Sequence, residues 1–439
     1  MALDVSQFYK ATNPSRPLQD DRYYINFSSV RGGDIVEELA RTITRLSPDE
    51  PTTQLLTGHI GSGKSTELLR LKKVLEAAGY HVVYFESDRD LEMSDVEVTD
   101  ILLVIARQVA VSLEMTGVTM RPPYFQRLFQ SIADTLRMPV EISNVSLSVG
   151  IATITTQSKD SADLRSQLHQ YLEPRTRNIL DAINGELLEP AIAHLKQLGK
   201  AGLVVIVDNL DRVSSSRKLG DRPQPEYLFV DRGDQLKRLG CHLLYTIPLS
   251  LAFSDDLPLL TNRFGVSPSV LTMVPVIDLE GNCQPESLAK LRQMVLARAF
   301  PDLGERDRIS HLEEVFDHSD TLDRLCTISG GHMRNLVRYL YSCLRKHDPP
   351  LGRDTLERVI RDERNDLLGL VNAEEWQQLF RAVKARTLQG DSDYNSLLRS
   401  LFLYEYRDNR GRWVDINPVL AETDTFREWR AGEGEGVMG

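Results

Sequence analysis

The chain has 439 residues, of which 41% are hydrophobic and 26% are charged, so it is long enough for two or three domains with separate cores. Its formal net charge of -11 argues against a surface that as a whole attracts nucleic acid or an anionic membrane, although the net charge does not exclude a local basic patch. No apolar run reaches the roughly 20 residues of a membrane-spanning helix, and MALDVSQFYK does not resemble a signal peptide. We therefore expect a cytoplasmic protein with no membrane segment, and reduced cysteines because none forms a CxxC pair.

Short apolar runs alternate with helical patterns through the first part of the chain. Residues 1–49 include IVEELARTITRL, whose apolar residues recur at helical spacing, and we expect this segment to pack on the domain that follows. The alternation is typical of buried parallel strands and predicts an α/β domain over residues 50–280. The predicted strands are residues 54–58, 81–86, 202–208 and 242–248.

An insertion over residues 115–200 separates the second and third of these strands. Inside it, Val145, Leu147, Val149 and Ile151 alternate strictly, which predicts a strand or hairpin. The residues that follow indicate one or two long helices.

Helical patterns replace the strands from about residue 285. They predict a helical domain over residues 281–348 and a winged-helix-like domain over residues 349–439 that ends in a flexible tail. The winged-helix prediction depends on LFLYEYRDNRGRWVDI, two strand-like runs joined by a turn at Asn409, Arg410 and Gly411.

Residues 58–65, GHIGSGKS, stand between a predicted strand and a predicted helix, which is the setting of a Walker A phosphate-binding loop. The glycines let backbone N–H groups surround a phosphate, Lys64 reaches the β- and γ-phosphates, and Ser65 ligates magnesium. The sequence therefore predicts ATP and Mg2+ as cofactors. The predicted nucleotide-binding residues are Gly58, His59, Ile60, Gly61, Ser62, Gly63, Lys64, Ser65 and Thr66.

Residues 203–213, LVVIVDNLDRV, form an apolar run that ends in an acid, as in a Walker B motif. Asp208 is expected to hold the magnesium, usually through water. Asp211 is the candidate that polarises the attacking water; the alternative is that it caps a helix or pairs with Arg212. Thr246 is a candidate for orienting the γ-phosphate, the alternative being that it only closes its strand.

One more acidic segment needs an interpretation. Residues 86–100, ESDRDLEMSDVEVTD, resemble a metal cluster in composition, but a solvated loop and helix start is the favoured interpretation.

The motifs GHIGSGKSTEL, VDNLDR, YTIP and GGHMRNL occur in the order seen in AAA+ ATPases and the related STAND signal-transduction ATPases, which the chain resembles over about residues 30–345. The resemblance implies a helical lid whose sensor 2 arginine, Arg334, contacts the γ-phosphate; a surface salt bridge is the alternative. It also implies a finger that reaches a neighbouring subunit's nucleotide, for which Arg263 is the candidate beside a structural role. Asn209 replaces the usual catalytic glutamate, which implies slow hydrolysis.

Together these observations predict an ATP-binding, slowly hydrolysing ATPase that acts as a nucleotide-dependent conformational or assembly switch. We expect a homo-oligomer with nucleotide and a protein partner that the sequence does not name. One alternative is a DNA-binding ATPase of the origin-recognition or transposition-regulator type, with arginines clustered around the wing; it is not favoured because acids are interleaved with them. Another is a nucleotide-bound scaffold that does not hydrolyse ATP. The wing arginines are Arg399, Arg407, Arg410 and Arg412.

Overall fold

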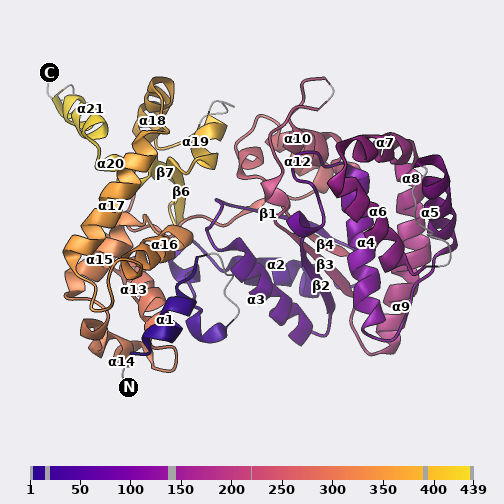
Figure 1. Ribbon diagram of the computed structural model, residues 1–439, viewed down its shortest axis with the longest axis horizontal. Coiled ribbons are helices and arrows are strands. Elements are labelled where there is room, and N and C mark those ends of the chain that lie inside the picture. Colours follow the sequence, from indigo (N-terminus) through magenta and orange to yellow (C-terminus); the bar gives the residue numbers. More distant parts are fainter. Residues whose placement is uncertain (1–2, 15–19, 137–144, 219, 389–393, 436–439) are drawn as a thin grey trace. The chain divides into compact units, whose positions relative to one another are not determined.

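The computed structural model describes residues 3–14, 20–136, 145–218, 220–388 and 394–435. Contacts divide the chain into two units, each with an apolar core of its own (Figure 1). Unit 1 contains Met1–Ile35, Gly58–Thr66 and Leu271–Gly439. Unit 2 contains Val36–Thr57 and Glu67–Val270.

Unit 2 is built on a five-stranded parallel sheet with the strand order β2-β3-β4-β1-β5. All four predicted strands are present, which confirms the α/β fold class of a P-loop NTPase. Every residue of β3 is buried, as expected for an apolar run in a central parallel strand. The strands are β1 (Thr53–Thr57), β2 (His81–Glu86), β3 (Leu203–Asp208), β4 (His242–Thr246) and β5 (Ser269–Val270).

Helices cover both faces of this sheet, with α3 (Lys64–Ala77) and α4 (Val98–Glu114) on opposite sides (Figure 1). Helix α4 contacts β2 and β3 and is buried along most of its length, because its residues are apolar almost all round. The predicted helix near the start of the chain is present as α2 (Ile35–Arg41), continued by a π-helical turn over Thr42–Leu46. Two further helices are α11 (Gly233–Leu236) and α12 (Leu257–Phe264).

The insertion is helical, so the strand predicted around residues 145–151 is wrong. Ser146 caps helix α6 (Leu147–Asp160), and Leu147 and Ile151 are buried while Val149 is exposed. Leu147 and Ile151 are four residues apart, so they also lie on one face of a helix. The packing of α6 against α4 buries this face and therefore favours the helix. The other insertion helices are α5 (Pro123–Leu136), α7 (Ala162–Leu172), α8 (Thr176–Ala182) and α9 (Glu189–Gln197).

Unit 1 is mainly helical and carries the predicted hairpin, β6 (Leu403–Asp408) paired antiparallel with β7 (Gly411–Ile416). Its helices pack around one apolar core, and a smaller cluster of Met273, Tyr404, Tyr406 and Trp413 lies under the hairpin. The winged-helix assignment stays a prediction. The main helices are α1 (Val5–Ala11), α13 (Pro285–Ala299), α14 (Glu305–Ser310), α15 (Ser319–Ile328), α16 (Met333–Leu344), α17 (Arg353–Leu368), α18 (Ala373–Ala385), α19 (Asn395–Arg399), α20 (Pro418–Ala421) and α21 (Asp424–Glu435).

The structure also bears on the expected absence of a membrane segment, on the cysteines and on the tail. No helix among the described residues is long and apolar enough to cross a membrane. Three of the cysteines are buried in the cores and Cys283 is exposed, and all four are free thiols. Helix α21 covers the first part of the predicted tail, and residues 436–439 lie outside the described residues. The four-part domain division stays a prediction.

Candidate functional site

The loop over residues 58–63 connects β1 to α3 and contains three glycines with positive φ: 150° at Gly58, 90° at Gly61 and 104° at Gly63. A Cβ added to Gly61 would lie 2.7 Å from Nε2 of His332, so a larger residue would displace the loop from its neighbour. A Cβ on Gly63 would meet nothing within 4 Å. The loop therefore requires glycine at these positions and is open at Gly63, and its role in phosphate binding stays a prediction.

Lys64 begins α3 and is buried, at 6% exposure. Its Nζ donates hydrogen bonds to the carbonyl oxygens of Gly58, at 2.7 Å, and His59, at 2.9 Å. The ammonium group therefore lies over the loop, where a phosphate would exchange these carbonyl contacts for a charge-assisted hydrogen bond. Ser65 follows in the first turn of α3 and supplies the hydroxyl oxygen that suits Mg2+.

Helix α16 contacts the loop directly within unit 1. The imidazole Nε2 of His332 lies 2.8 Å from the carbonyl oxygen of Ile60, and the backbone N–H of Arg334 donates to the carbonyl oxygen of Gly61 at 3.2 Å. His332 also caps α16, since its Nδ1 accepts from the N–H of Asn335. The side chain of Arg334 is exposed, and its contact with a γ-phosphate stays a prediction.

Strand β6 contacts the same loop from the hairpin. The backbone N–H of Glu405 donates to Nε2 of the buried His59 at 3.0 Å. Burial, together with His332 and Lys64, lowers the pKa of His59 to about 3, and burial lowers the pKa of His332 to about 4. Burial also raises the pKa of Glu405 to about 7, although its ion pair with Arg412 acts in the opposite direction.

Arg31, from the N-terminal segment, completes these contacts. Its Nη2 donates to the carbonyl oxygen of Ser62 at 2.9 Å, and its guanidinium lies 5.6 Å from the ring centre of Phe27. Sequence reasoning missed the roles of Arg31, His332 and Glu405. The GGH triplet before α16 was the available signal for a capping histidine, whereas only the tertiary contact reveals Glu405.

The Walker B acid lies at the carboxyl end of β3 in unit 2. Asp208 is buried, and its carboxylate accepts hydrogen bonds from the Tyr84 hydroxyl at 2.8 Å and from the Asn209 N–H at 2.7 Å. These bonds hold a hard oxygen ligand of the kind that magnesium prefers. Asp208 and Ser65 therefore fit the predicted ion by their chemistry, and their role as ligands stays a prediction.

Thr246 and Asp211 lie near the turn that follows β3. The Thr246 hydroxyl is buried, accepts from the N–H of Leu210 at 3.0 Å and lies 3.3 Å from the carbonyl oxygen of Val207. It thus braces the chain after Asp208, and its proposed contact with phosphate stays a prediction. Asp211 lies in the 3-10 turn over Leu210–Arg212. Its part in catalysis also stays a prediction.

Arg263 belongs to α12, and its guanidinium pairs with Asp234 at 2.7 Å. Lys237 donates to the carbonyl oxygen of Arg263 at 3.2 Å. The Arg263 side chain is about a third exposed, at 36%. A role as a finger toward a neighbouring subunit requires this pair to open, and it stays a prediction.

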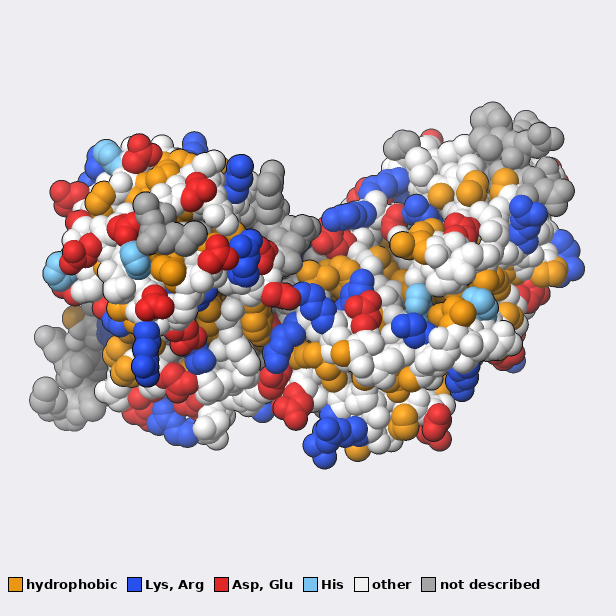
Figure 2. Space-filling model, turned by 90° about the horizontal axis from the view of Figure 1, so that it is seen from below, with side chains coloured by type: hydrophobic (Ala, Val, Ile, Leu, Met, Phe, Trp, Pro, Cys, Tyr) orange, Lys and Arg blue, Asp and Glu red, His pale blue; other side chains and the backbone are white. Residues whose placement is uncertain are grey.

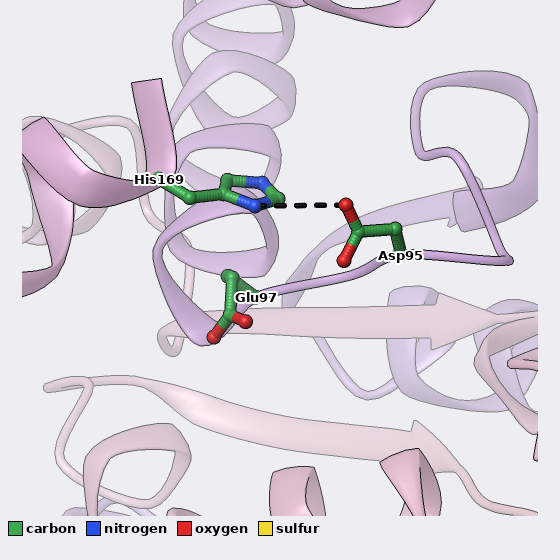
Figure 3. Close-up of side chains that lie close together, drawn as sticks. All are labelled: Asp95, Glu97 and His169. Atoms are coloured by element: carbon green, nitrogen blue, oxygen red, sulfur yellow. Dashed lines mark ion pairs between the residues drawn. The ribbon is translucent and has the colours of Figure 1, made fainter. Parts of the chain in front are cut away.

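The acidic segment contributes a half-buried ion network. Asp95 and Glu97 lie close to His169, which faces Asp95 (Figure 3). The Lys218 ammonium lies 2.6 Å from Asp95 and 3.0 Å from Glu97, so a protein cation occupies the place where a metal would bind. Burial raises the pKa of Asp95, but the hydrogen bond and charge of Lys218 outweigh burial, so the pKa of Asp95 is lowered overall. The predicted helix start is present, because α4 begins at Val98, whereas the loop before it is a half-buried ion network rather than a solvated loop.

A comparison with family models matches part of the chain. Residues 34–219 match the model of the KAP family P-loop domain. No curated protein matches the chain. Among solved structures, the Walker-type ATPase PABY2304 of Pyrococcus abyssi is 13% identical, with 95% of this chain and 99% of that chain covered and a TM-score of 0.44. The ORC2 protein of Aeropyrum pernix in its ADPNP–ADP complexes is 13% identical, with 98% of each chain covered and a TM-score of 0.41.

Identities this low transfer no substrate or partner to this chain. The conclusion comes instead from the strand order of the sheet and the matched family model, which agree with the motifs GHIGSGKSTEL and VDNLDR. Residues 34–219 therefore form a domain with the fold of a P-loop NTPase.

Proposed function

We propose that the protein is an ATP-dependent switch of the STAND kind, in which nucleotide at the loop changes the contacts of the lid and the C-terminal hairpin. The observation that carries the proposal is that one loop contacts both elements. Ile60 meets His332 of the lid, and His59 meets Glu405 of the hairpin. A phosphate that rearranges the loop must therefore strengthen or weaken these two contacts, which is the differential interaction that a switch requires.

Magnesium and slow hydrolysis are part of the proposal. Mg2+ would be held by Ser65 and Asp208, and it would neutralise charge that develops on the phosphates. Asn209 has an amide that cannot accept a proton from water, and this supports slow turnover. Slow turnover suits a switch, because each nucleotide state then persists long enough to be read by a partner.

Assembly is the proposed output, in the cytoplasm and with other copies of the chain. Arg263 and Arg334 are the proposed cations for the γ-phosphate, one from a neighbouring copy and one from the lid. DNA binding gains no support from the wing arginines, because Arg410 pairs with Glu280 and Asp408, and Arg412 pairs with Glu405. Lys and Arg side chains are also intermixed with Asp and Glu on the face drawn in Figure 2.

Hydrogen exchange tests the switch directly. The purified protein is compared with a slowly hydrolysed ATP analogue, with ADP and without nucleotide, and exchange is followed in peptides of α16 and β6. The proposal expects the analogue and ADP to give different protection in both elements. Protection that rises at the loop but stays the same in α16 and β6 would mean that nucleotide binds without switching these elements.

A further inference from the structure

Residue 209, directly after the Walker B aspartate, is an asparagine and has no carboxylate. The carboxylate of Asp88, which follows the neighbouring strand β2, lies beside it. Nδ2 of Asn209 donates a hydrogen bond to Oδ1 of Asp88 at 2.9 Å. Asn209 itself has φ 62° and ψ 8°, a left-handed conformation that turns the chain directly after Asp208. We propose that Asp88 is the general base for ATP hydrolysis, an inference that rests on the proposed ATP turnover.

The sheet explains why Asp88 lies at this turn. Glu86 at the end of β2 is the register partner of Asp208 at the end of β3, and Asp88 follows two residues later in a 3-10 turn. The Ser87 hydroxyl donates to the carbonyl oxygen of Asp208 at 2.8 Å and ties this turn to the Walker B strand. Asp88 and Asp208 are therefore at the carboxyl edge of a parallel sheet, which is the edge where α/β sheets bind their ligands. Strand β1, which leads into the phosphate loop, belongs to the same sheet.

The environment of Asp88 suits a group that must exchange partners. Its Oδ2 accepts from Nη1 of Arg212 at 2.6 Å, and the two side chains are 25% and 41% exposed. Ion pairs this exposed contribute little to stability, so the pair can open at small cost. Oδ1 can stay bound to Asn209, which makes Asn209 a positioning residue, while Oδ2 passes from Arg212 to a water molecule.

The proposed step is a hydrolysis with water as the only co-reactant. The water oxygen forms a bond to the γ-phosphorus as the bond from that phosphorus to the β,γ-bridging oxygen breaks. One water proton passes to the carboxylate of Asp88 and then to solvent, and ADP leaves with the electron pair of the broken bond. The conventional place for this carboxylate is one residue after the Walker B aspartate; here it would come from the adjacent strand instead.

The insertion also contacts this turn. Nζ of Lys159, at the end of α6, donates to the carbonyl oxygen of Arg89 at 2.9 Å. The turn that carries Asp88 is thus fixed by β3 on one side and by the insertion on the other. These contacts fix the backbone of the turn, while the Asp88 carboxylate itself keeps the exposure that a change of partner requires.

The principal test is Asp88→Asn, which keeps the shape of the side chain and removes its ability to accept a proton. Single-turnover ATP hydrolysis is expected to fall about 10²- to 10⁴-fold, while calorimetry finds Mg-ATP affinity within error of the original protein. Asp90→Asn is the matched control, because Asp90 lies two residues away and also pairs with an arginine, Arg107. It is expected to leave turnover unchanged.

Two further variants separate a base from a structural anchor. Arg212→Gln breaks the same ion pair but keeps the carboxylate, so it is expected to retain turnover, whereas an anchoring role would make it as slow as Asp88→Asn. Asp88→Glu is expected to restore part of the rate, because it keeps a carboxylate that can accept a proton.

The outcomes distinguish this inference from the proposed function. If the original protein binds no nucleotide, the proposed function fails first and the inference with it. If it binds ATP and hydrolyses it, but Asp88→Asn hydrolyses at the original rate, only the inference is overturned. The inference is also overturned if Arg212→Gln loses as much activity as Asp88→Asn, or if Asp211→Asn alone abolishes turnover.

Discussion

Lys64 is the residue on which nucleotide affinity depends most directly. Lys64→Ala removes the ammonium that lies over the loop, and we expect ATP affinity to fall by at least about 2 to 3 kcal/mol, roughly 30- to 160-fold. Calorimetry of both proteins measures the change, with circular dichroism as a check of folding. Lys72→Ala is the control, since Lys72 lies on the same helix and pairs with Glu76. Equal affinities in two folded proteins would refute the phosphate-binding role.

The buried histidines give unit 1 a defined response to acid. His59 and His332 have their pKa lowered from 6.5 to about 3 and about 4, so between about pH 5 and 6 the unfolded chain binds most of two protons at these positions and the folded chain almost none. Glu405 opposes this, because its pKa is raised from 4.5 to about 7 and the folded chain holds one proton there. The unfolded state therefore binds one more proton in total, and stability is lost as the pH falls through this window.

His59→Asn removes one of the two titrating histidines, so the net proton difference in this window becomes close to zero. The slope of the unfolding free energy against pH is expected to decrease by about 1.4 kcal/mol per pH unit. Urea unfolding at several pH values measures it, followed by tryptophan fluorescence, because Trp376, Trp413 and Trp429 all belong to unit 1. A slope equal to that of the original protein would mean that His59 is protonated in the folded state.

At the scale of elements, helix α6 depends on a close approach at Gly150. A Cβ on Gly150 would lie 2.2 Å from the ring of Phe129 on α5, so the two helices could not keep their spacing. We expect Gly150→Ala to destabilise the insertion by about 1 to 3 kcal/mol. Hydrogen exchange in peptides of α4 and α6 reports this change.

Gly185→Ala is the matched control for this substitution. Gly185 is also helical, but a Cβ there would meet nothing within 4 Å. It should therefore be neutral or slightly stabilising, because alanine is the better helix former. Equal effects of the two substitutions would contradict the packing of α5 on α6.

At the scale of the whole molecule, we expect ATP to promote association of copies. If a neighbouring copy supplies Arg263 to the nucleotide, ATP binds the associated form better, and by linkage it favours association to the same extent. ADP, which lacks the γ-phosphate, should act more weakly. Light scattering over a range of protein concentrations measures the mass with a slowly hydrolysed analogue, with ADP and with neither.

Arg263→Ala should reduce this association without weakening nucleotide binding to the monomer. Arg238→Ala removes a nearby exposed arginine and should have no such effect. A mass that stays monomeric with the analogue at every concentration would exclude self-assembly and favour a monomeric or partner-dependent switch.

The sequence by itself determined the parts whose signal is local. Apolar β-branched runs such as 203–208 are typical of strands buried in a parallel sheet, and GHIGSGKS between a strand and a helix is typical of a phosphate-binding loop. The hairpin at residues 403–416 was also predictable, because two strand-like runs flank a short turn. These features depend on residues that are close in the chain.

Tertiary structure alone decided the parts that depend on distant residues. Residues 147–160 form helix α6 instead of the predicted strand, because α6 packs against α4 and buries Leu147 and Ile151. Glu405 reaches His59 across 346 positions of sequence, and Asp88 reaches Asn209 across 121 positions, so no spacing rule could pair them. The sequence could show that Asn209 lacks a carboxylate, but only the register of β2 on β3 brought Asp88 beside it, because strand pairing is set by the packing of the whole sheet.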